Sequence, residues 1–184
     1  MSLSRIWEEF EANGRLSQRS IRELREALHS ADPYDAITVA TDCGERELVP
    51  DILLCLDSPD PMVRWNAIAS IYTRFRVPER LDTLIRLATE EDSIMVRAVA
   101  IESIGQTLPK VKDPHLRRKM AELLMSTFEN DEEQWDSAYL GILAAVDVLP
   151  LDMPPANKPL DRNQIDPTKL KEFREQYLAG SPAD

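Results

Sequence analysis

The residue types that carry catalysis in proteins are sparse in this sequence and form no recognisable catalytic set. Its two histidines, His29 and His115, are far apart, and each lies beside an expected helix end. Nucleophilic catalysis needs a nucleophile with a base, metal catalysis needs clustered ligands, and phosphate chemistry needs a glycine-rich loop. The sequence contains none of these patterns. We therefore expect no enzyme activity, no catalytic residue and no cofactor, and a solvated or helix-dipole role for both histidines.

Two other groups of residues invite a metal or redox interpretation. Cys43 and Cys55 have neither a C-x-x-C spacing nor matching histidines, so we expect two small buried apolar residues in a reducing compartment. The acidic run 129–133 lacks the alternating ligands and the turn glycine of a calcium loop. A solvated loop that caps the next helix is expected there, and no metal site.

Composition narrows the class of protein further. The chain has 184 residues, 43% hydrophobic and 30% charged, with a formal net charge of −11. This length can bury a substantial core without disulfides or metals. The acidic balance argues against nucleic acid and favours a basic protein partner. No apolar run approaches the ~20 residues of a membrane span, and the first ten residues lack a signal-peptide pattern, so we expect no membrane association and a cytoplasmic location.

The elements that position these residues are expected to be helices throughout. Five glycines in the whole chain are too few for a sheet-rich fold with many tight turns. The first helix should end at the Asn13-Gly14 pair and act as an end cap, with Leu3, Ile6, Trp7 and Phe10 on one face. Ser17 should cap the second helix, and Asp-Pro pairs should begin later ones, at Asp32-Pro33, Asp60-Pro61 and Asp166-Pro167.

A repeat runs along the chain. Residues 62–71, 95–104 and, more loosely, 133–142 superimpose, with a shared alanine at Ala67, Ala100 and Ala138 and a fainter copy at Ala36. Each copy follows another amphipathic run, at residues 21–28, 48–56, 81–88 and 116–128. The repeating unit is therefore a helical hairpin. Such hairpins have too much apolar surface to bury alone, so neighbours must stack around one elongated core.

Residues 54–67, with the spacing Asp-x-x-Val-Arg-x-x-Ala, resemble a HEAT repeat, and residues 87–100 resemble it again. Two good copies and two degenerate ones cover about residues 17–149. The resemblance implies an all-α fold, a right-handed α-solenoid of about four hairpins with an N-terminal capping helix. It also implies a scaffold that binds a protein through its concave helical face.

In this family an arginine at the position of Arg64 and Arg97 ties one repeat to the next through a carboxylate. The resemblance therefore implies structural pairs of Arg64 with Asp60 and of Arg97 with Asp92. A ligand-binding role for these arginines is the alternative. Bidentate pairing with a carboxylate explains arginine rather than lysine at such positions.

The composition changes after residue 149, where five prolines fall within eighteen residues. We expect a HEAT-like domain over residues 1–149, then an extended strap and a terminal helix over residues 150–184 that pack on the same domain. The helix either covers the last repeat or folds back along the array. Alternatively, the strap occupies the concave groove and moves when a partner arrives.

A partner-binding surface is expected on the helix face away from the core. Positions one before, three after and six after the marker alanine should line it, and aromatic and arginine side chains should flank it. Packing of the aromatic side chains on the preceding repeat is the competing interpretation. The candidate protein-binding residues are Trp65, Asn66, Ser70, Tyr72, Thr73, Arg74, Gln106, Trp135 and Tyr139.

Three functions remain open on this basis. The first is a non-enzymatic scaffold or adaptor, including an assembly factor or an immunity-type protein, present as a monomer or weak homodimer. The second is a subunit of a bilin-lyase-like HEAT-repeat enzyme or chaperone, although this chain is shorter than those arrays. The third is a capping fragment of a larger complex. A DNA glycosylase is disfavoured because the few clustered arginines stand in an acidic chain.

Overall fold

The computed structural model describes residues 3–146 and 160–179, and it contains helices and connecting loops with no strand among these residues. The expected all-α class is confirmed over this part of the chain. The chain divides into two compact units, Met1–Arg80 and Leu81–Asp184. The expected solenoid of four hairpins spans both units and stays a prediction. Within the described residues, no helix is both long and apolar enough to cross a membrane.

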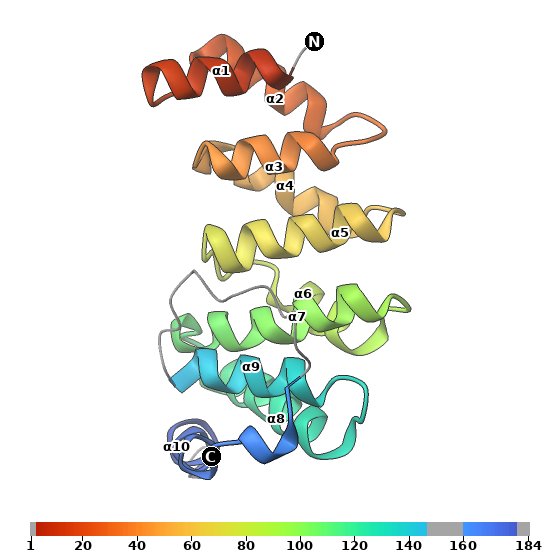
Figure 1. The fold of residues 1–184 in the computed structure, drawn as a ribbon, viewed down its shortest axis with the longest axis vertical. Helices are drawn as coiled ribbons and strands as arrows, with labels where there is room; N and C mark the ends of the chain where they lie inside the picture. The colour runs from red at the N-terminus through yellow and green to blue at the C-terminus, as the bar shows by residue number, and fades with distance from the viewer. Residues whose placement is uncertain (1–2, 147–159, 180–184) are drawn as a thin grey trace. The chain divides into compact units, whose positions relative to one another are not determined.

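The first unit is a helix followed by two hairpins. Its α-helices are α1 (Leu3–Asn13), α2 (Gln18–Leu28), α3 (Tyr34–Asp42), α4 (Val49–Leu54) and α5 (Pro61–Ile68), with short 3₁₀ segments at Arg46–Leu48 and Cys55–Asp57. Helices α1, α3 and α5 lie in one layer, with α2 and α4 behind them (Figure 1). Helix α3 contacts both α1 and α5, so the second helices of the hairpins pack directly on one another.

Local sequence signals account for the ends of these helices. Gly14 adopts a φ of +66°, which a glycine reaches without strain, and its N–H donates to the Phe10 carbonyl at 2.7 Å to end α1. The Ser17 hydroxyl accepts from the Ser20 N–H to cap α2, and the Asp60 carboxylate accepts from the Met62 N–H at 2.8 Å to cap α5. The expected glycine stop and these two caps are confirmed.

Helix α5 continues as a π-helical segment over Ala69–Arg74, which the repeat pattern did not predict. The Phe75 N–H donates to the Ser70 carbonyl at 2.8 Å, five residues back. The loop that follows is held by Arg80, whose guanidinium donates to the Leu53 carbonyl at 2.9 Å and to the Asp57 carboxylate at 2.8 Å. Because a π-helix has about one more residue per turn than an α-helix, this segment is wider than the rest of α5.

The second unit also contains two hairpins and one further helix. Its α-helices are α6 (Leu81–Glu90), α7 (Ile94–Thr107), α8 (Pro114–Asn130), α9 (Trp135–Val146) and α10 (Pro167–Tyr177), with 3₁₀ segments at Leu108–Lys110 and Arg162–Gln164. Helix α7 packs on α6, α8 packs on α9, and α7 and α9 make the most extensive contact in the unit. The same pairing of second helices therefore holds α3 against α5 and α7 against α9.

The marker alanines lie in the core of each unit. Ala67, Ala100 and Ala138 are fully buried, and Ala36 is 1% exposed. Apolar side chains from both helices of each hairpin are buried as well. A methyl side chain at this position allows the paired helices to approach closely, which agrees with the register inferred from the repeat.

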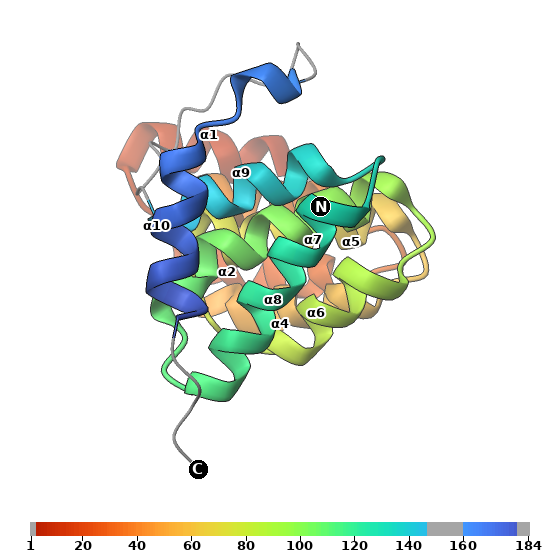
Figure 2. The same cartoon turned by 90° about the horizontal axis from the view of Figure 1, so that it is seen from below.

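Helix α10 covers α8 and α9 (Figure 2). Asp166 caps it as expected by accepting from the Thr168 N–H at 2.8 Å. Its Phe173 side chain is fully buried, and the Tyr177 hydroxyl donates to the Ala145 carbonyl at 3.0 Å. Helix α10 thus lies on the last hairpin. Most of the expected proline strap, residues 150–159, lies outside the described residues, so its place in a groove stays a prediction.

Candidate functional site

The expected binding residues of α5 and its π-helical end do not form one exposed surface. Trp65 is partly exposed, but Tyr72 is fully buried, and its hydroxyl donates to the Glu79 carbonyl at 2.8 Å. The placement of Tyr72 on a binding surface is therefore wrong. A hydroxyl group that reaches a loop carbonyl allows a large aromatic side chain to fill the core of the unit.

The polar positions of α5 point at α3 rather than at solvent. Asn66 is 8% exposed, and its side-chain N–H groups donate to the Tyr34 carbonyl at 3.0 Å and to the Thr38 hydroxyl at 2.9 Å. Ser70 is 2% exposed and hydrogen bonds to the Thr41 hydroxyl at 2.8 Å. These two residues hold neighbouring hairpins together, which corrects their expected exposure. The helix face that we expected to be exposed is buried where the second helices of neighbouring hairpins stack.

The remaining candidates are more exposed but are distributed between the two units. Thr73 is partly exposed, and Arg74 is exposed and lies 3.6 Å from the Asp42 carboxylate. In the second unit, Gln106 and Trp135 are partly exposed, and the Arg162 guanidinium lies over the Trp135 ring at 5.0 Å. These residues retain surface that a partner can reach.

Tyr139 is the other aromatic candidate whose expected exposure is wrong. It is 4% exposed, its ring lies 5.8 Å from that of Phe128, and its hydroxyl accepts from the Asp166 N–H at 2.7 Å. Tyr139 therefore anchors the start of α10 to α9. A residue that the repeat pattern assigned to a partner serves the packing of this chain instead.

The two equivalent arginines brace their own loops. Arg64 donates to the Ser58 carbonyl at 2.7 Å and to the Pro59 carbonyl at 3.0 Å. Arg97 donates in the same way to the carbonyls of Glu91 and Asp92, at 2.6 and 3.4 Å.

The expected carboxylate partners take other places. Asp60 caps α5, and Asp92 offers Arg97 its backbone carbonyl. Arg97 also lies 3.7 Å from the Glu133 carboxylate, which precedes α9 in the next hairpin. We retain a structural role for both arginines as a proposal, with loop carbonyls among their acceptors.

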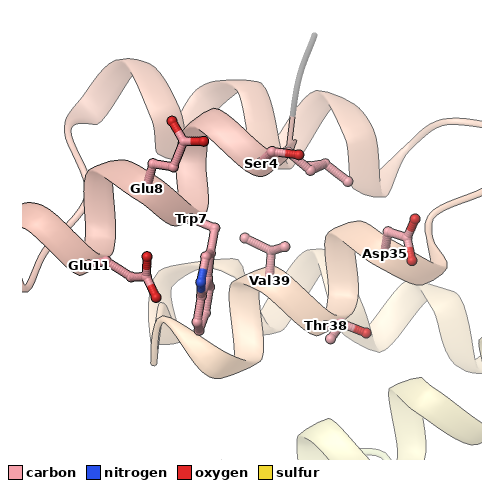
Figure 3. A pocket seen from close by; sticks show the side chains of 8 residues that line it. Ser4, Trp7, Glu8, Glu11, Asp35, Thr38 and Val39 are labelled. Atoms are coloured by element: carbon pink, nitrogen blue, oxygen red, sulfur yellow. The ribbon is translucent and has the colours of Figure 1, made fainter.

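A surface that the repeat pattern did not predict lies between α1 and α3. It is an open groove of about 510 Å³, and Figure 3 shows the Trp7 ring and the Val39 side chain side by side within it. The Glu11 carboxylate lies beside the indole, and Asp35 stands at the other end of the groove. The full lining is Leu3, Ser4, Trp7, Glu8, Glu11, Asp35, Thr38 and Val39.

The electrostatic character of this groove is acidic. Three of its eight lining residues are carboxylates, and none is basic. Glu8, Glu11 and Asp35 are exposed, and none of them forms an ion pair with another described residue. The groove therefore presents uncompensated negative charge beside an aromatic ring.

The residues that α1 contributes to this groove were visible in the sequence, but the groove itself could not be located from them. Trp7, Glu8 and Glu11 were visible within the first helix, and Trp7 was assigned to the apolar face of an end cap. Trp7 is in fact only partly buried, and Ile6 is the fully buried residue of α1. The missing information was which helix would lie beside α1, since α3 contributes Asp35, Thr38 and Val39 to the groove.

The described part of the chain contains neither a cluster of metal ligands nor a reactive thiol. No three side chains of the metal-ligating types His, Cys, Asp and Glu lie close enough to hold an ion there. Cys43 and Cys55 are free and buried, as expected, and burial raises the pKa of each thiol to about 11. Both sulfurs are therefore protonated at neutral pH and are poor nucleophiles.

Paired helices that stack through their second members define the class of helical-repeat proteins. Within this class, residues 21–105 match the sequence model of the family described as HEAT repeats, so this stretch of the chain consists of HEAT repeats. The match contains both well-formed copies, those marked by Ala67 and Ala100. No curated protein and no solved structure matches the chain.

Proposed function

We propose that this chain is a non-enzymatic scaffold or adaptor that binds a basic partner protein through the helical layer formed by α1, α3 and α5. HEAT repeats commonly mediate protein–protein interactions, and scaffolds of this kind are typically non-enzymatic. The observation that carries the proposal is the acidic, tryptophan-containing groove between α1 and α3.

The chemistry of the layer supports this kind of partner. Aromatic side chains that keep one side exposed bury a large area at low entropic cost when a partner covers them. Trp7 and Trp65 are both of this type, and they lie on α1 and α5 of the same unit. The net charge of −11 draws a basic partner toward the chain and repels nucleic acid and anionic membrane surfaces.

The test is reconstitution of a complex. The tagged full chain would be used to capture proteins from its source cells at low and high salt, and the main captured protein would be purified and titrated back by calorimetry. A saturable complex of fixed stoichiometry supports the proposal. Folded protein that forms no such complex at either salt, or that turns over a co-purifying substrate, overturns it.

A pair of variants locates the surface. We expect Trp65→Ala to weaken the reconstituted complex about tenfold or more, because an interface tryptophan contributes strongly to affinity. Leu54→Ala is the matched control, since Leu54 is 59% exposed on α4 in the other layer. Equal effects of the two substitutions would show that the layer of α1, α3 and α5 does not form the interface.

A further inference from the structure

The groove between α1 and α3 selects for a particular kind of ligand atom. Its lining includes Trp7 and the acidic residues Glu8, Glu11 and Asp35, with the Glu11 carboxylate beside the indole (Figure 3), and it contains no lysine, arginine or histidine. An anion or an acidic peptide would meet only repulsion there. A cation would meet an aromatic face with the Glu11 carboxylate beside it, in a groove where Glu8 and Asp35 add negative charge.

The neighbouring acidic residue Glu9, unlike Glu8 and Glu11, has partners among the described residues of the chain. Glu9 accepts from the Ser17 N–H at 2.7 Å and from the Ser20 hydroxyl, and it lies 3.7 Å from the Arg5 guanidinium. Glu9 thus serves the packing of α1 on α2. Glu8 and Glu11, on the groove side of the same helix, have no comparable partner among the described residues.

The α3 wall of the groove is held in place by hydrogen bonds from α5. The Asn66 side chain on α5 donates to the Thr38 hydroxyl at 2.9 Å and to the Tyr34 carbonyl at 3.0 Å. Thr38 lines the groove, and Asn66 is 8% exposed, so α5 fixes the position of this wall. A wall that is ordered before binding reduces the entropic cost of binding.

We propose that this groove binds an arginine side chain from a basic segment of the partner, with the guanidinium stacked on Trp7 and hydrogen bonded to the Glu11 carboxylate beside the ring, while Glu8 and Asp35 add negative charge around the groove. Arginine fits better than lysine because its planar guanidinium can stack on an indole while its forked N–H groups reach carboxylates. The volume of about 510 Å³ leaves room for the flanking backbone of an extended segment. This inference rests on the proposed function, because it names the chemistry by which that partner is recognised.

The experiment uses the full-length protein and a short peptide of repeated Arg-Ser-Gly units. Binding is followed through the indole N–H signals of the three tryptophans in two-dimensional NMR, with the Trp7 signal identified by its loss in Trp7→Phe. We expect a saturable shift of the Trp7 signal, and little change for Trp65 and Trp135. A shift confined to Trp65 or Trp135, or no saturable shift at all, overturns the proposal.

Two peptide analogues separate charge from shape. The same peptide with citrulline in place of arginine keeps the size of the side chain and loses its charge, so it should not bind. A lysine peptide keeps the charge and loses the planar fork, so its dissociation constant should be several times higher. Equal binding of the citrulline peptide would show that the groove does not recognise a cation, and equal binding of the lysine peptide would show that it does not select arginine.

A matched pair of variants separates a site from diffuse attraction. Glu8→Gln/Glu11→Gln removes two groove charges, and Glu26→Gln/Glu132→Gln removes two exposed charges elsewhere. We expect the first pair to weaken binding about tenfold and the second to weaken it less than twofold. Equal losses would show that the peptide responds to net charge alone.

Failure of this inference can be told apart from failure of the proposed function. If the arginine peptide does not bind the groove but the captured partner still forms a saturable complex, the scaffold role holds and the groove assignment falls. If the peptide binds as expected and no protein complex forms, the groove chemistry holds and the scaffold role falls.

Discussion

At the scale of single residues, the contact between α7 and α9 depends on two glycines. A β-carbon added at Gly105 on α7 would lie 1.9 Å from the Gly141 carbonyl oxygen on α9. Gly141 in turn lies near the Leu124 side chain and the Ile101 carbonyl. Neither position has room for a side chain, so the backbones of α7 and α9 touch directly.

Gly105→Ala should therefore destabilise the second unit by about 3 kcal/mol, as overpacking in a core does, although alanine is the better helix former. The measurement is the free energy of unfolding from urea denaturation. Gly44→Ala is the control, because Gly44 has a φ of +71° and open space around it. That substitution should cost only about 1 kcal/mol of backbone strain. A Gly105→Ala protein as stable as the parent would contradict the close contact.

Glu102, on α7, makes the stability of the contact between α7 and α9 depend on pH. Its pKa is raised from 4.5 to about 7, chiefly because the carboxyl group is buried against α9. A hydrogen bond with Ser137 opposes this rise, and the nearby negative charge of Asp136 contributes to it. In the unfolded chain the carboxyl group regains its ordinary pKa. The folded state therefore holds this proton more tightly, so the stability contributed by Glu102 is complete below pH 4.5 and is lost as the pH rises through 7.

Glu102→Gln should remove this loss. At pH 8 the variant should be more stable than the parent by up to roughly 3 kcal/mol, from about 1.4 kcal/mol for each pKa unit. The difference should shrink as the pH falls to 4.5. Thermal unfolding across this pH range measures it, with exposed Glu132→Gln as the control. A constant difference at all pH values would show that the carboxyl group of Glu102 does not titrate in the folded state.

At the scale of elements, α10 depends on one buried side chain for its attachment. Phe173 is fully buried, its ring lies 5.1 Å from that of Tyr177, and Tyr177 reaches the Ala145 carbonyl of α9. The ion pair of Arg174 with Glu129 is exposed and adds little. The helix is short, so it depends on this docking for its stability.

Phe173→Ala should release α10, because removal of a buried phenylalanine costs about 3–5 kcal/mol. Hydrogen exchange should then be rapid over residues 167–177 and should remain slow in α7 and α9. Lys171→Ala is the control, since Lys171 is exposed on the same helix. Persistent protection of α10 in Phe173→Ala would show that the polar contacts alone hold it.

At the scale of the whole molecule, charge determines how a partner approaches. A net charge of −11 creates a field that steers a cationic partner during its encounter. We expect the association rate with the reconstituted partner to fall about tenfold or more between low and physiological salt, with a smaller change in the dissociation rate. Stopped-flow mixing measures both rates. An association rate that salt does not change would contradict a basic partner.

Much of the local structure followed from the sequence alone. The all-helical class, the hairpin repeat and the buried marker alanines were predicted, as were the glycine stop of α1 and the caps provided by Ser17, Asp60 and Asp166. These features depend on residues close together in the chain, where hydrogen-bonding geometry and the helical period act directly. The HEAT-repeat resemblance also rested on such short patterns.

The partner-facing surface was decided by tertiary structure. The second helix of each hairpin carries apolar or small side chains on most of its sides. The spacing of apolar residues therefore does not reveal which side a neighbouring helix will cover. Asn66, Ser70, Tyr72 and Tyr139 were consequently assigned to a surface and proved to be buried. Trp7, assigned to an apolar cap, instead lines an acidic groove because α3 lies beside it. A single helix determines its own faces, but only its neighbours determine which of those faces remain free.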